Sequence, residues 1–114
     1  MKRILCIGKH NEGGIESSAY LLDIVSSQFN NGFLLDNELS NYSSTIYADY
    51  IYVKKFINKS SEFRELAKWI KQPGLTFGGL LRKSGDLWGV YITFVPGSAD
   101  EFAFKLSFDI TAST

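Results

Sequence analysis

The segment from Glu101 to Ile110 carries the strictest hydropathy pattern in the chain. Successive side chains of a β-strand point to opposite faces of a sheet, whereas a helix would spread such a set around its circumference. The pattern therefore predicts an amphipathic strand with one buried face and one partly solvated face, as in an antiparallel sheet. Its apolar residues stand at every second position: Phe102, Phe104, Leu106, Phe108 and Ile110.

Two more strands are predicted immediately before this one. Residues 75–83 and 86–95 are rich in aliphatic and aromatic side chains, and Ser84-Gly85 separates them as a short hairpin turn would. Pro96-Gly97-Ser98 supplies a second turn. The segment 75–110 thus predicts a C-terminal three-stranded antiparallel meander.

Helical spacing predicts two amphipathic helices earlier in the chain. From Ile15 to about Gln28, apolar residues recur at intervals of three and four, and Asn30-Asn31-Gly32 follows as a helix stop. The second helix begins at Ser60 or Ser61 and ends at Gln72-Pro73-Gly74. Its apolar stripe consists of Phe63, Leu66, Ala67 and Ile70.

The remaining segments complete the predicted fold. Residues 3–8 predict a strand followed by a loop to Gly14, and residues 33–36 predict a short strand before a polar connection over 37–44. Thr45–Phe56 is rich in Tyr, Ile and Val, which favours a strand. Together the elements predict a single α+β domain over residues 1–114. Its two helices would cover one face of a largely antiparallel sheet.

The composition excludes several classes of protein. A chain of 114 residues that is 45% hydrophobic and 15% aromatic can bury a core without disulfide or metal staples. The longest apolar run is far short of the roughly 20 residues that span a bilayer, and Lys9 interrupts the first run before a signal-peptide core could form. A single cysteine, Cys6, suits a reducing compartment. We therefore expect a soluble, cytoplasmic protein that makes no membrane contact.

Catalytic and cofactor motifs are absent from the sequence. The Gly8–Gly14 loop matches neither glycine-rich phosphate-binding pattern, and His10, the only histidine, cannot form a two-imidazole site. Cys6 stands in an apolar run, which favours a buried, inert thiol over a nucleophile. His10 and Glu12 are either an acid–base pair or solvated loop residues. We predict a protein that is not an enzyme and has no cofactor and no metal site.

Charge is segregated along the chain, although 12 basic residues balance 12 acidic ones. Residues 10–53 contain no Lys or Arg and six carboxylates, whereas residues 54–83 hold eight basic residues against two acidic ones. A focused acidic surface would attract a basic partner, unless folding interleaves the two blocks. Nucleic-acid binding is the less favoured interpretation of the basic block, because the neutral total gives no domain-wide positive field.

Tyrosines are concentrated in the acidic part of the chain. Tyr combines a rigid apolar body with a hydroxyl that tolerates water, and it is enriched at protein interfaces. The same residues would also suit a half-exposed strand. On the interface interpretation, the predicted partner-binding residues are Asp36, Glu38, Tyr42, Tyr47, Asp49 and Tyr50.

A compact, cofactor-free domain with an acidic, tyrosine-bearing segment resembles the small bacterial immunity proteins that neutralise toxins of neighbouring cells, such as those of contact-dependent inhibition systems. The resemblance concerns the format of the whole chain, and no motif carries it. It implies stoichiometric inhibition, in which acidic side chains and tyrosines cover the basic groove of a toxin such as a nuclease. A small-molecule-binding or small enzymatic α+β domain is the alternative. The sequence leaves the partner's identity and the oligomeric state open.

Overall fold

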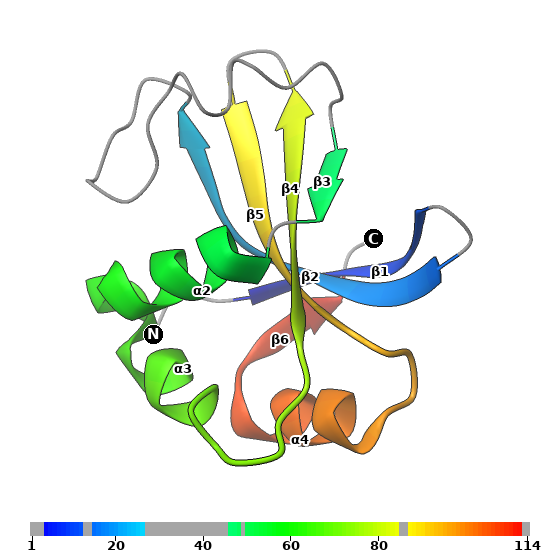
Figure 1. Cartoon of the computed structure of the whole chain (residues 1–114), viewed down its shortest axis with the longest axis vertical. Coiled ribbons are helices and arrows are strands. Elements are labelled where there is room, and N and C mark those ends of the chain that lie inside the picture. The colour runs from blue at the N-terminus through cyan, green and yellow to red at the C-terminus, as the bar shows by residue number, and fades with distance from the viewer. Residues whose placement is uncertain (1–3, 13–14, 27–45, 49, 85–86, 113–114) are drawn as a thin grey trace.

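The computed structural model describes residues 4–12, 15–26, 46–48, 50–84 and 87–112 (Figure 1). In chain order the elements are β1 (Ile4–Glu12), β2 (Ile15–Ser26), β3 (Ile46–Ala48), α2 (Tyr50–Lys59), the 3-10 helix η1 (Ser61–Phe63), α3 (Arg64–Trp69), β4 (Gly78–Ser84), β5 (Leu87–Phe94), α4 (Ala99–Ser107) and β6 (Ile110–Ala112). The predicted strand at 33–36 and the connection at 37–44 lie outside the described residues.

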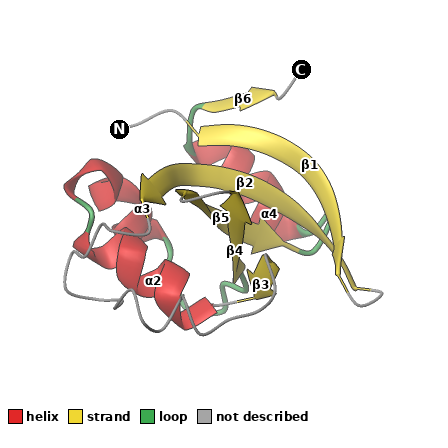
Figure 2. Cartoon of the chain, turned by 90° about the horizontal axis from the view of Figure 1, so that it is seen from above, coloured by secondary structure: helices red, strands yellow, loops and turns green. Residues whose placement is uncertain are grey.

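The six strands form one sheet in the order β3-β4-β5-β2-β1-β6. Its pairs are antiparallel except for β1 and β6, which run parallel. The predicted α+β class and the largely antiparallel pairing are therefore confirmed. Figure 2 shows β1 and β2 as two long, curved, adjacent strands, with β5 and β4 below them in this view. A bulge interrupts β1 between Cys6 and Gly8, and Gly8 takes the left-handed φ of 98° that favours glycine.

The hairpin of β4 and β5 and the helical segment before it are confirmed. β4 pairs with β5 from Gly78 opposite Thr93 to Ser84 opposite Leu87. η1 and α3 occupy the segment predicted as the second helix, and their buried side chains include Phe63 and Leu66. Local turn chemistry and amphipathic spacing agree with the tertiary structure in this part of the chain.

The predicted helix at 15–28 is wrong, because residues 15–26 form β2. This strand lies between β1 and β5, and its residues Ser18, Ala19 and Tyr20 are all buried. A central strand that is covered on both faces lacks clean alternation, so its apolar residues can mimic helical spacing. The predicted Gly8–Gly14 loop is likewise mostly strand, since β1 continues to Glu12.

The predicted strand at Thr45–Phe56 is also wrong over most of its length. Of the described residues in this segment, Ile46–Ala48 form strand β3, and α2 begins at Tyr50. The buried residues of α2 are spaced as one helical stripe: Tyr52, Val53, Phe56 and Ile57. Burial of this stripe in the core outweighs the strand propensity of Tyr, Ile and Val.

The alternating segment at Glu101–Ile110 is mainly helix, so the third strand of the predicted meander is wrong. α4 covers Ala99–Ser107. Its N-cap residue Ser98 accepts a hydrogen bond from the Glu101 N–H at 3.2 Å, the first half of a capping box. Phe104 is fully buried, but Phe102 and Leu106 are 65% and 73% exposed. The alternation therefore reflects exposed apolar residues on a helix.

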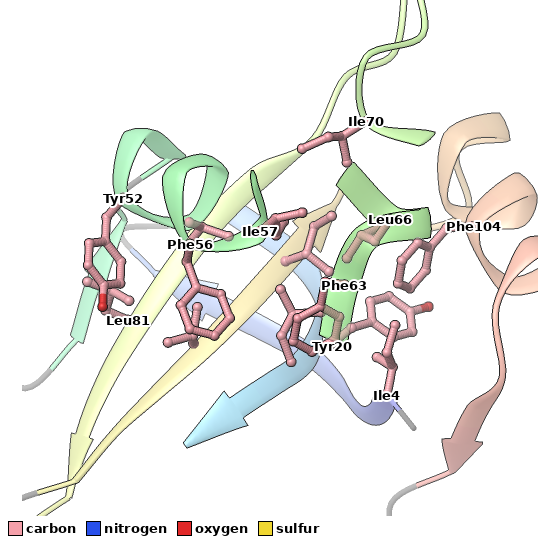
Figure 3. Close-up of a cluster of buried hydrophobic side chains, with 14 of the residues drawn as sticks. Ile4, Tyr20, Tyr52, Phe56, Ile57, Phe63, Leu66, Ile70, Leu81 and Phe104 are labelled. Atoms are coloured by element: carbon pink, nitrogen blue, oxygen red, sulfur yellow. The ribbon is translucent and has the colours of Figure 1, made fainter. Parts of the chain in front are cut away.

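One buried cluster joins the helices to the sheet. Figure 3 shows Tyr20 of β2 beside Phe104 of α4, with residues of α2 and α3 packed along the same layer. The ring centroid of Phe104 lies 5.0 Å from that of Tyr20, 4.9 Å from that of Phe94 and 5.6 Å from that of Trp69. Phe104 thus sits at the meeting point of α3, α4 and the central strands.

Changing Phe104 to Ala should cost about 3–5 kcal/mol of unfolding free energy, because the ring leaves a cavity in this cluster. Phe102→Ala, on the exposed side of the same helix, should cost less than about 0.5 kcal/mol. Urea denaturation of both variants provides the measurement. Equal losses would favour a strand, in which residues two apart share one buried face.

Candidate functional site

Glu101 is a buried carboxylate that fastens α4 to the central strand β2. It is only 6% exposed, and it accepts a hydrogen bond from the Tyr20 hydroxyl at 2.6 Å through Oε2. Its Oε1 accepts from the Gly97 N–H at 2.8 Å. A buried charge is tolerated when such bonds replace its lost hydration.

Hydrogen bonding decides the charge state of this group. Burial would raise the pKa of the Glu101 carboxyl, but bonds from Ser18, Tyr20 and Gly97, with Lys105 nearby, lower it below its usual value. For the partner, burial foremost and the bond to Glu101 raise the pKa of the Tyr20 hydroxyl. At neutral pH the Glu101 carboxyl is therefore ionised and the Tyr20 hydroxyl keeps its proton. This fixed charge state suits a structural hydrogen bond between α4 and β2.

Glu101→Gln should destabilise the fold by about 1–3 kcal/mol at neutral pH. The glutamine side-chain amide has one acceptor oxygen in place of two, so it cannot accept all of the hydrogen bonds from Ser18, Tyr20 and Gly97. The lowered pKa of Glu101 means that its stabilising charge is fully present above the unfolded value of 4.5 and is lost as the pH falls through the lower folded value. The difference in unfolding free energy between wild type and the Glu101→Gln variant should therefore shrink below about pH 4. Urea denaturation across this pH range measures it.

The exposed Glu65 of α3 supplies a matched control for that experiment. Glu65→Gln should leave stability nearly unchanged at neutral pH. If the stability difference between wild type and Glu101→Gln stays constant from neutral to acidic pH, the assigned charge state of Glu101 is contradicted.

The predicted partner-binding residues are only partly described. Asp36, Glu38, Tyr42 and Asp49 lie outside the described residues. Tyr47 belongs to β3, where its backbone pairs with Leu81 of β4, and its side chain is not described. Only Tyr50 has a described side chain, so the structure neither assembles the predicted set nor separates it.

Tyr50 begins α2 and takes part in a small exposed patch. Its ring centroid lies 4.9 Å from that of Phe77, and the Lys54 ammonium lies 5.7 Å from the Tyr50 centroid. Tyr50 is 40% exposed, and its chain neighbour Ile51 is 59% exposed. We call Tyr50, Ile51 and Phe77 the Tyr50 patch. Aromatic rings such as those of Tyr50 and Phe77 are enriched in the cores of protein interfaces, whereas lysines such as Lys54 belong to the polar rim.

The C-terminal end of α2 and the following helices form a basic pocket of about 460 Å³. The sequence flagged the basic block at 54–83 but not the concave shape that part of it adopts. The four-residue spacing of Arg64 and Lys68 was the available signal, since residues four apart in one helix lie on the same face. The pocket is lined by Asn58, Lys59, Ser60, Ser61, Arg64, Ala67, Lys68 and Lys71.

The candidate nucleophile and acid–base residues do not form a described constellation. Cys6 is half-buried in β1 and contributes to the raised pKa of Tyr20. His10 and Glu12 also belong to β1, where their backbones pair with Ser17 and Ile15, and their side chains are not described. Among the described residues, no three His, Cys, Asp or Glu side chains are grouped as metal ligands.

Comparison with protein-family models, with curated proteins and with solved structures found no match to this chain. Within the described part of the structure, no helix has both the length and the apolar character needed to cross a membrane.

Proposed function

We propose that this chain is a non-catalytic, protein-binding domain that acts as a cytoplasmic bacterial immunity protein. In this proposal it neutralises a cognate toxin by covering the toxin's active-site groove. The observation that carries the proposal is the Tyr50 patch, in which the exposed Tyr50 and Ile51 stand at the end of the acidic, tyrosine-bearing segment and the half-buried Phe77 contacts the Tyr50 ring.

The geometry of Tyr50 suits an interface anchor. The contact with Phe77 restricts the ring, so little side-chain entropy remains to be lost when a partner binds. Ile51 adds exposed apolar area next to it, and Lys54 supplies a polar rim. Exposed tyrosines that become buried when a partner binds carry a large share of the binding energy at many interfaces.

Charge would guide the encounter in this mechanism. The acidic residues at positions 36, 38 and 49 precede the Tyr50 patch and would attract a basic toxin groove. The patch would then exclude water at the contact and slow dissociation. Inhibition would be stoichiometric, because occupancy of the groove alone blocks the toxin's substrate.

Tyr50→Ala should weaken binding to the toxin partner, recovered by pull-down with this chain, by about 30-fold or more, mainly through faster dissociation, if Tyr50 is a hot spot. Phe102→Ala is the matched control, since it removes a 65% exposed ring from a different helix and should change affinity less than about threefold. Surface plasmon resonance with a catalytically inactive toxin domain measures both.

The same assay tests steering by charge. Asp36→Lys combined with Glu38→Lys should slow association strongly at low salt and weakly at high salt, because salt screens exposed charges. Binding that is indifferent to the Tyr50 truncation and to these reversals would refute the proposed surface.

A combined change of Cys6, His10 and Glu12 to Ala tests the absence of catalysis. Neutralisation of the toxin should stay within a few-fold of wild type, because the proposed mechanism uses no nucleophile and no acid–base pair. Circular dichroism and thermal melting confirm that the variant is folded. A folded variant that still binds the toxin but no longer neutralises it would point to an enzyme.

A further inference from the structure

The basic pocket gathers positive charge in a concave site. Four of its lining residues are cationic: Lys59, Arg64, Lys68 and Lys71. Ser60, Ser61 and Asn58 add hydroxyl and amide donors, and none of the described residues that line the pocket is acidic. Glu62 and Glu65 belong to the same helical segment but are not part of the lining. The positive charges of Arg64, Lys68 and Lys71 around one cavity repel each other, and a bound anion relieves that repulsion.

The donor set matches phosphoryl groups better than a single carboxylate. The planar guanidinium of Arg64 can donate two parallel hydrogen bonds to one phosphoryl group. The lysine ammonium groups act as point charges that can neutralise further phosphoryl oxygens. Because four cations surround the pocket, a ligand with several negative charges would be favoured over a monoanion.

The shape of the site favours a small molecule over a nucleic acid. A volume of about 460 Å³ falls in the range of small-molecule sites. Non-specific nucleic-acid binding needs an extended positive track and exposed aromatic rings for stacking. Trp69, the aromatic residue of α3, instead packs against Phe104 and Phe108 with ring-centroid distances of 5.6 Å and 5.7 Å.

We propose that the basic pocket is a binding site for a small molecule that carries two or more phosphoryl groups. Arg64 holds one phosphoryl group through its guanidinium, and Lys68 and Lys71 neutralise the others. Ser60 and Ser61 donate hydroxyl hydrogen bonds. This site is independent of the Tyr50 patch, so the proposal does not rest on toxin binding.

Isothermal titration calorimetry with inorganic tripolyphosphate and with ATP tests this site. Arg64→Glu combined with Lys68→Glu should weaken binding of both probes by at least about tenfold, because two pocket cations become anions. Lys55→Glu combined with Arg82→Glu is the matched control. Both control residues are exposed and lie outside the pocket, and the pair changes net charge by the same amount. The control should keep affinity within about threefold of wild type.

Each outcome of the titration decides the proposal. Tighter binding of ATP than of tripolyphosphate supports a nucleotide as the ligand, and the reverse supports another polyphosphate. Equal losses in the pocket and control variants would overturn the proposal, as would failure of wild type to bind either probe at millimolar concentration. Tighter binding of a single-stranded RNA oligonucleotide than of both small probes would also overturn it.

A milder pair guards against misfolding of the charge-reversal variant. Lys68→Ala combined with Lys71→Ala truncates two exposed side chains and should still reduce affinity for tripolyphosphate several-fold. Arg64→Lys keeps the charge but removes the guanidinium fork, so an intermediate loss is expected. Full affinity in both of these variants would overturn the proposal.

Discussion

The attachment of α4 to the centre of the sheet is the constraint on which the rest of the structure depends. Glu101 and Phe104 stand three residues apart, so they share one face of α4, and both contact Tyr20 of β2. The carboxylate is kept charged in the interior by its donors, and the Phe104 ring joins α3 to the sheet. Once α4 is fixed in this way, the chain returns beside β1 as the parallel strand β6.

Helix α2 connects the two proposed functional surfaces. The Tyr50 patch lies at its first turn, and Asn58 and Lys59 at its last turn line the basic pocket. Ten residues of α-helix span roughly 15 Å, so the residues that α2 contributes to the two surfaces lie at opposite ends of the helix. The buried stripe of α2 fixes both, because Val53 and Ile57 are fully buried in the common core.

Prediction from the sequence succeeded where local chemistry and tertiary environment agree. Ser84-Gly85 and the apolar runs beside it identified the hairpin of β4 and β5, and Gln72-Pro73-Gly74 marked the end of the helical segment. Tyr50, one of the predicted partner-binding residues, is 40% exposed in the structure, and its role in binding stays a prediction. The basic pocket was not predicted, because the sequence of a basic segment does not show whether its side chains lie on a flat surface or around a cavity.

The sequence by itself determined the α+β class, the largely antiparallel pairing and the segregation of charge, because these follow from local hydropathy, turn residues and composition. Only the tertiary structure decided that β2 is a strand and that α2 and α4 are helices. A strand in which successive residues on both faces are buried, as Ser18, Ala19 and Tyr20 are in β2, needs no alternation. From the sequence alone, a glutamate such as Glu101 is expected to face solvent. Its buried hydrogen-bond partner, Tyr20, lies 81 positions away in the chain. Such long-range contacts choose between helix and strand when the local pattern permits both.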